Sequence, residues 1–158
     1  MIDKKDDAFL ATNIKGMMMT LIAHWNGRMD AERADTEFAA IRRSDMRVFG
    51  QLRGRTLKLS AVHREMGFSR QAAQQAVARL VEHGVLQLDP EPDGHRDKIV
   101  SVTEKGQRLR ALAARQIREA EADCARIIGT EGVEALREQL IALIEGSDIK
   151  KPPVTKTS

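Results

Sequence analysis

The segment from Ser69 to Val81 carries arginine and glutamine side chains and no acidic one. Glutamine offers a hydrogen-bond donor and an acceptor together, which matches the major-groove edge of adenine, and arginine pairs with guanine or with phosphate. Carboxylates in the same place would repel phosphate. This composition predicts contact with double-stranded DNA. The candidate contact residues are Ser69, Arg70, Gln71, Gln74, Gln75 and Arg79.

A second set of cations lies in the turn that follows. The stretch DPEPDGH, with two prolines and an Asp-Gly pair, separates two apolar runs and predicts a β-hairpin with a polar tip. An arginine at such a tip can enter the minor groove, where it reads groove width and potential rather than base identity. The candidates here are His95, Arg96 and Lys98. The alternative is an ordinary solvated turn in which Asp97 pairs with Arg96.

The elements that must position these residues are two short helices and the hairpin. Ser60 is expected to cap the first helix, which Gly67 ends, and Ser69 to cap the second, which ends at Gly84. Apolar residues then alternate with polar ones on both sides of the turn, as in half-buried strands. This order predicts a winged helix-turn-helix, whose second helix enters the major groove.

Amphipathic helices flank this middle segment. Apolar residues recur at helical spacing from Leu10 to Trp25, and a second helix is expected from Phe38 to Leu52. Thr103 is the expected cap of a long helix with a heptad-like apolar seam, and Gly129 separates it from a last helix. In a chain of 158 residues these stripes lack a globular body to cover them. They therefore predict a homodimer.

Charge and composition are those of a cytoplasmic protein with a polyanionic partner. The part between Arg42 and Arg110 holds 14 of the 26 basic residues but 8 of the 23 acidic ones, so its net charge is +6 against −3 elsewhere. The single cysteine excludes an internal disulfide. The stretch MIDKKDDAFLATNIKG does not show the basic-then-apolar pattern of a secretory signal, and no apolar run reaches the roughly 18–20 residues that span a bilayer, so we expect a cytoplasmic protein.

Three stretches resemble the MarR family of winged-helix transcriptional regulators: RRSDMRVFGQL, LSAVHREMGFSRQAAQQAVARLVEHGVL and DGHRDKIVSVTEKG. The wing pattern is the most specific part, with Arg96 seven residues before Thr103 and Gly106 three after it. The family commonly has Asp two residues before that arginine, where this chain has Gly94. The resemblance implies a mainly α fold with a small β-hairpin wing, and a homodimer on a pseudo-palindromic operator. It further implies a repressor released by a small aromatic or lipophilic ligand.

The resemblance also divides the chain into functional regions. These are a dimerisation region at 1–32 and 104–146, a winged helix-turn-helix at 33–103 and a flexible tail at 147–158. The ligand would lie where the dimerisation helices meet the winged lobe, and an aromatic floor with a cationic edge would suit a hydrophobic carboxylate. The candidate ligand residues are His24, Trp25, Arg28, Phe38 and Arg42. Alternatively, Trp25 and Phe38 are simply core residues.

Other functions remain as alternatives. The four histidines are scattered, and no HExxH, GxSxG or GxGxxG motif occurs, so the sequence predicts neither an enzyme nor a cofactor. A thiol-responsive regulator would use Cys124, but this residue shares an apolar stripe with Ile117 and Ile127, which favours a small core residue. A metal-responsive regulator would use His24, Cys124 or acidic residues that the fold brings together. A protein-interaction module without DNA binding would tolerate acids in the segment Ser69 to Val81.

Overall fold

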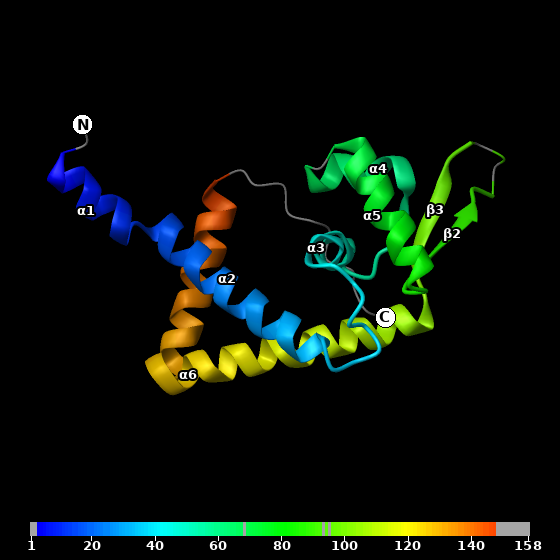
Figure 1. The fold of residues 1–158 in the computed structure, drawn as a ribbon. Coiled ribbons are helices and arrows are strands. Elements are labelled where there is room, and N and C mark those ends of the chain that lie inside the picture. The colour runs from blue at the N-terminus through cyan, green and yellow to red at the C-terminus, as the bar shows by residue number, and fades with distance from the viewer. Residues whose placement is uncertain (1–2, 68, 93, 95, 148–158) are drawn as a thin grey trace. The chain divides into compact units, whose positions relative to one another are not determined.

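The computed structural model describes residues 3–67, 69–92, 94 and 96–147, and its helices and strands are labelled in Figure 1. His95 and residues 148–158 of the expected tail lie outside the described residues. The chain divides into two units, Met1–Arg43 and Ser44–Ser158, each of which is described by itself. These units are compact parts of the structure. They are not the dimerisation and DNA-binding regions expected from the sequence, which were divided by function.

The first unit contains two helices, α1 (Lys4–Thr12) and α2 (Ile14–Arg33). The sequence predicted one continuous helix here, and the structure corrects this because Asn13 between them is extended, with φ −70 and ψ 151. Its side-chain oxygen accepts a hydrogen bond of 2.8 Å from the Gly16 amide, so Asn13 is the N-cap of α2. Asparagine competes with a continuous helix in this way because its short side chain bonds to nearby backbone groups.

The chain leaves α2 through a series of turns before α3 (Arg43–Leu52) begins. A helix starting at Phe38 was predicted, but Phe38 and Ile41 lie in these turns and are 4% and 3% exposed. The Thr36 hydroxyl donates to the Arg33 carbonyl at 2.7 Å and accepts from the Phe38 amide at 3.2 Å. The apolar spacing at Phe38 and Ile41 therefore signals burial, not helix.

The second unit contains α4 (Leu59–Met66), α5 (Arg70–Glu82) and a three-stranded sheet. The strands β1 (Leu57–Lys58), β2 (Leu86–Pro90) and β3 (Lys98–Val102) are antiparallel in the order β1-β3-β2. The hairpin β2–β3 was predicted, whereas β1 has too few residues to show an alternating pattern. Apolar side chains from these elements and α3 are buried together, namely Val48, Phe49, Leu52, Val62, Ala73, Ala76, Val77, Leu80, Val85, Leu86 and Val100.

The last helix, α6 (Glu104–Gly146), begins and bends where the sequence predicted. The Thr103 hydroxyl caps it by accepting from the Gly106 amide at 3.0 Å. Gly129 interrupts the helix with φ 77 and ψ 160, a conformation open almost only to glycine. Across this bend Arg137 donates two hydrogen bonds to Glu121, at 2.8 Å and 3.2 Å. The two arms of α6 are thus tied together by a bidentate ion pair.

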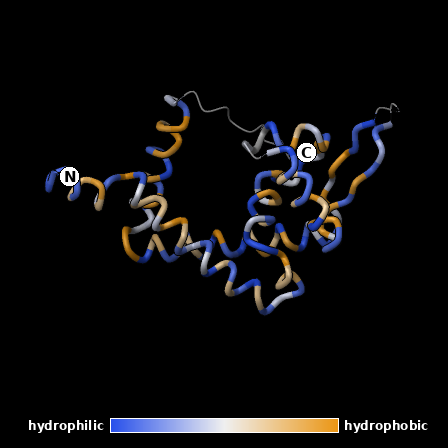
Figure 2. The backbone as a smooth tube through the Cα atoms, turned by 45° about the horizontal axis from the view of Figure 1, so that its top comes forward, coloured by the Kyte–Doolittle hydropathy of each residue, from blue (hydrophilic) through white to orange (hydrophobic). Residues whose placement is uncertain are grey.

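Exposed apolar residues recur along α1, α2 and α6. Figure 2 colours the backbone by the hydropathy of each residue. On α6 they include Ile117 at 51% and Ile127 at 83% exposure, and on α2 they include Ile14 at 66%. No helix in the described ranges is long and apolar enough to cross a membrane. Apolar surface of this extent on two separate segments is typical of a protein–protein interface.

Candidate nucleic-acid interface

The start of α5 is held by a cap that the sequence predicted. Ser69 is extended, with φ −61 and ψ 149, and its hydroxyl oxygen accepts from the Ala72 amide at 3.1 Å. Gly67, which ends α4, has φ 66, a left-handed conformation that favours glycine. No acidic residue occurs in the first turn of α5, so the remaining amide groups at its N-terminus face no carboxylate of that turn.

One face of α5 is buried in the core, so the opposite face is directed toward solvent. Ala73, Ala76, Val77 and Leu80 are between 0% and 4% exposed. The opposite side carries exposed side chains that make no side-chain hydrogen bond or ion pair to another described residue. These residues are Arg70, Gln71, Gln74 and Gln75. The helix therefore presents three donor–acceptor amides and a cation of the kind that pair with base edges and phosphates.

Arg79 differs from the other candidates on α5 because its guanidinium is engaged inside the protein. Its Nε and Nη2 donate to the two carboxylate oxygens of Asp45, at 2.8 Å and 2.7 Å. The Asp45 side chain is 0% exposed, and the Arg79 side chain is 30% exposed. The hydrogen bond to Asp45 raises the pKa of Arg79. Contact with DNA is thus left to the part of the guanidinium that does not face Asp45.

The wing candidates Arg96 and Lys98 are both exposed. The alternative of a solvated turn had Asp97 paired with Arg96, but in the described residues Asp97 has other partners. Its carboxylate accepts from the hydroxyl of Ser60 and, at 2.9 Å, from the amide of Lys98. Ser60 was the predicted N-cap of α4, but the structure places Lys58 at that position and Ser60 inside the first turn. Ser60 instead joins α4 to the wing.

Asp45 was not recognised from the sequence, although a signal for it existed, and Asp97 was considered only as a partner of Arg96. Asp45 shares a helix face with Val48, Phe49 and Leu52, all of which are buried on α3. An acid at a core position of an amphipathic helix must find a partner or lose its charge. The sequence could have predicted a buried ion pair at this point, but not its partner, which lies 34 residues away.

The candidate ligand residues differ in exposure. Phe38 is buried, Trp25 and Arg28 are half-buried, and His24 and Arg42 are exposed. Burial of Phe38 agrees with a core role, but it does not distinguish this role from a ligand-contacting one. A ligand site formed by these residues stays a prediction.

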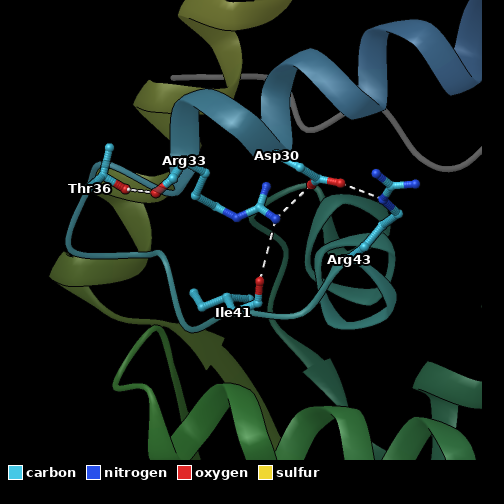
Figure 3. Close-up of polar contacts among 5 residues, drawn as sticks. All are labelled: Asp30, Arg33, Thr36, Ile41 and Arg43. Carbon is cyan, nitrogen blue, oxygen red and sulfur yellow. Dashed lines mark hydrogen bonds and ion pairs between the residues drawn. The ribbon is translucent and has the colours of Figure 1, made fainter.

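A polar cluster that the sequence did not reveal lies in the first unit, at the end of α2 and in the turns that follow it (Figure 3). Asp30 forms ion pairs with Arg33, at 2.6 Å, and with Arg43. Arg33 is buried and also donates to the Ile41 carbonyl at 3.4 Å. Burial alone would raise the pKa of Asp30, but the hydrogen bonds from Arg33 and Arg43 lower it. Asp30 is therefore ionised at neutral pH and holds the two arginines of this cluster together.

Cys124 is half-buried on α6. In the described part of the chain, no group of three or more His, Cys, Asp and Glu residues is placed to hold a metal ion. Neither observation adds support to a thiol-responsive or a metal-responsive regulator.

Comparison with known proteins identifies the fold. No protein-family sequence model and no curated protein matches the chain. Several solved structures have a similar fold. The structure of a MarR transcriptional regulator from Methanosarcina mazei Go1 matches with a TM-score of 0.69 and 14% sequence identity. The match covers 93% of this chain and 92% of that one. The transcriptional regulator SlyA has a TM-score of 0.68 at 14% identity, over 86% and 94%. MarR has a TM-score of 0.67 at 16% identity, over 86% and 98%.

The chain thus has the winged-helix fold of MarR-family transcriptional regulators, mainly helical with a small three-stranded wing and long helices at both ends. This confirms the fold class and, at the level of fold, the resemblance drawn from the sequence.

Proposed function

We propose that the protein is a sequence-specific regulator of transcription that binds double-stranded DNA as a homodimer. The observation that carries this proposal is the outward face of α5, where Arg70, Gln71, Gln74 and Gln75 are exposed beside a first turn without carboxylates. The fold is that of MarR-family regulators, which are not enzymes, and this supports the same function. We further propose that it acts in the cytoplasm as a repressor that a small ligand releases.

The N-terminus of α5 would carry the contacts to bases and phosphates. The Ser69 oxygen accepts from the Ala72 amide, so its hydroxyl hydrogen stays available to a phosphate. Free amide groups in the first turn and the positive end of the helix dipole favour the same anion. Gln74 and Gln75, one turn further along, would pair with base edges, and Arg70 would bind guanine or phosphate.

The wing would add contacts to the minor groove beside the major groove that α5 occupies. Arg96 and Lys98 are exposed on either side of Asp97, and His95 precedes them in the sequence. A cation in a narrow minor groove is attracted by its negative potential and adds affinity for every sequence.

The homodimer would be formed by the exposed apolar residues of α1, α2 and α6. Two-fold symmetry would place two copies of α5 in successive major grooves of a pseudo-palindromic site. Light scattering at micromolar concentration tests this part directly. A stable, folded monomer would contradict it.

The ligand would be a small aromatic or lipophilic acid that contacts His24, Trp25, Arg28, Phe38 and Arg42. Arg42→Ala should reduce release of DNA by such an acid and leave DNA binding without ligand unchanged. Equal release from the variant and the wild type would remove Arg42 from the proposed site.

Selection of duplexes from a random DNA library, followed by mobility-shift titration of the selected and a scrambled duplex, tests the central proposal. We expect a selected sequence with two-fold symmetry and preferential binding to it. The variant Arg70→Ala/Gln74→Ala/Gln75→Ala should lose the preference while keeping its fold. A folded wild type that enriches no sequence and binds no duplex at low salt would contradict the proposal. It would favour a winged-helix module that binds only proteins.

A further inference from the structure

Helix α4 has no side-chain cap of its own. Its N-cap residue, Lys58, is extended with φ −66 and ψ 138 and makes no capping hydrogen bond, and no acid occurs in the first turn. The first amide groups of a helix lack acceptors within the helix and are normally satisfied by a side chain or by water. In this chain the acceptor comes from elsewhere in the sequence.

Asp97, the residue before β3, supplies that acceptor. One carboxylate oxygen accepts from the Ser60 amide at 3.4 Å, and the other accepts from the Ser60 hydroxyl. The residues are 37 positions apart in the chain. The hydrogen bond from the Ser60 hydroxyl is the largest cause of a lowered pKa at Asp97. The carboxylate is therefore charged at neutral pH and lies at the positive end of the α4 dipole.

An ion pair joins the other strand of the hairpin to the same place. Lys58 forms an ion pair with Glu91, the residue that directly follows β2. The Glu91 side chain is 8% exposed. The Glu91 amide also donates to the Asp97 carbonyl at 3.4 Å. The residue after β2 and the residue before β3 are thus attached to the N-cap and to the first turn of α4, respectively.

We infer that Asp97 is a positioning residue for DNA binding: it caps α4 from the wing and, with Ser60, holds the wing fixed relative to the helix-turn-helix. Arg96 and Lys98, the two neighbours of Asp97, carry the wing contacts of the proposed function, on which this inference rests. Fixing Asp97 reduces the backbone freedom of both cations, so less conformational entropy is lost when they meet DNA. MarR-family wings commonly have an Asp two residues before the wing arginine, where this chain has Gly94. In this chain the Asp that fixes the wing directly follows Arg96.

Amide hydrogen exchange of the free protein tests the cap without any DNA. In Asp97→Ala, the amides of β2, β3 and the first turn of α4 should exchange about 2- to 30-fold faster, the range that the loss of a helix cap produces. Ser60→Ala should act in the same direction, and Asp97→Asn, which keeps a carbonyl acceptor, should act less. The matched control is Asp89→Ala, because Asp89 lies in the same hairpin, is exposed, and has a side chain that bonds only to Gln87 among the described residues.

Coupling to Arg96 tests the positioning. With a random-sequence duplex at low salt as the probe, Arg96→Ala should weaken wild-type binding but have at most half that effect on a logarithmic scale in the Asp97→Ala background. In the Asp89→Ala background Arg96→Ala should keep its full effect, which controls for the lost negative charge. Unchanged exchange in Asp97→Ala would overturn the cap, and an equal effect of Arg96→Ala in all backgrounds would overturn the positioning. If the wild type binds no duplex, the proposed function fails, while the exchange result still decides whether Asp97 caps α4.

Discussion

Arg79 on α5 donates two hydrogen bonds to the fully buried carboxylate of Asp45 on α3, at 2.8 Å and 2.7 Å. The pair joins the helix that presents the proposed DNA contacts to a core helix of the same lobe. Its geometry is the bidentate one in which guanidinium and carboxylate match best. Arg79 is thereby a structural residue in addition to any contact that it makes with phosphate.

Arg79→Ala should destabilise the protein strongly because it leaves a buried carboxylate without a partner. Stranding a buried charge typically costs about 3–5 kcal/mol, whereas replacing both members of such a pair with apolar residues is often neutral. Urea denaturation should therefore show a large loss for the single variant and recovery in Arg79→Met/Asp45→Leu. If the single variant unfolds at the wild-type urea concentration, the pair does not support the fold.

Gln74→Ala and Gln75→Ala should relax base preference more than they reduce total affinity. A good bidentate contact discriminates between bases by about 1–3 kcal/mol, and loss of an uncharged amide leaves the phosphate contacts in place. Titration of the selected and the scrambled duplex measures this difference. Gln51→Ala, an exposed glutamine of α3, is the control. Full discrimination in both α5 variants would show that these residues do not read the sequence.

Arg96→Ala should weaken binding to every sequence and make binding less dependent on salt. Each phosphate neutralised by the protein contributes about 0.9 to the slope of log affinity against log salt, so two lost contacts per dimer should reduce it by about 2. Arg118→Ala, an exposed arginine of α6, removes the same charge outside the wing. A slope and affinity equal to those of the wild type would mean that the wing does not touch the DNA.

Asp30→Asn should lower thermal stability at neutral pH by an amount that shrinks in acid. Because Arg33 and Arg43 lower the pKa of Asp30 in the folded state, its charge contributes stability above its unfolded pKa of about 4. This contribution is lost as the pH falls through the lower folded pKa. Melting temperatures of wild type and variant should therefore converge in acid. Asp35→Asn, in the turn after α2, is the matched control, and a difference independent of pH would exclude this linkage.

Gly106→Ala should destabilise the junction between α6 and the wing. A Cβ atom at Gly106 would overlap the backbone oxygen of Val85 and a methyl group of Val102. Overpacking of this kind costs about 1–3 kcal/mol, which exceeds the gain of roughly 0.5–1 kcal/mol from replacing glycine in a helix. Gly50→Ala on α3, where nothing lies within 4 Å, should instead be neutral or stabilising. Denaturation curves that rank the two variants in the opposite order would contradict this close approach.

The sequence by itself predicted the features that depend on neighbouring residues. Ser69 and Thr103 cap the helices that they were expected to cap, and Gly67 and Gly129 end or break helices where predicted. Each of these signals acts within about one helical turn, because a cap bonds to amides two or three residues away and a glycine changes its own φ. The buried face of α5 followed from apolar spacing for the same reason.

Only the tertiary structure decided which distant polar groups meet. Asp45 meets Arg79 across 34 positions and Ser60 meets Asp97 across 37, and β1 exists only because β3 pairs with it. Ser60 shows the limit of local reasoning: a serine before a helix predicts a cap, yet here the carboxylate of Asp97 takes that role. Such partners depend on how the chain folds back on itself, which the spacing of residues along one helix or strand does not contain.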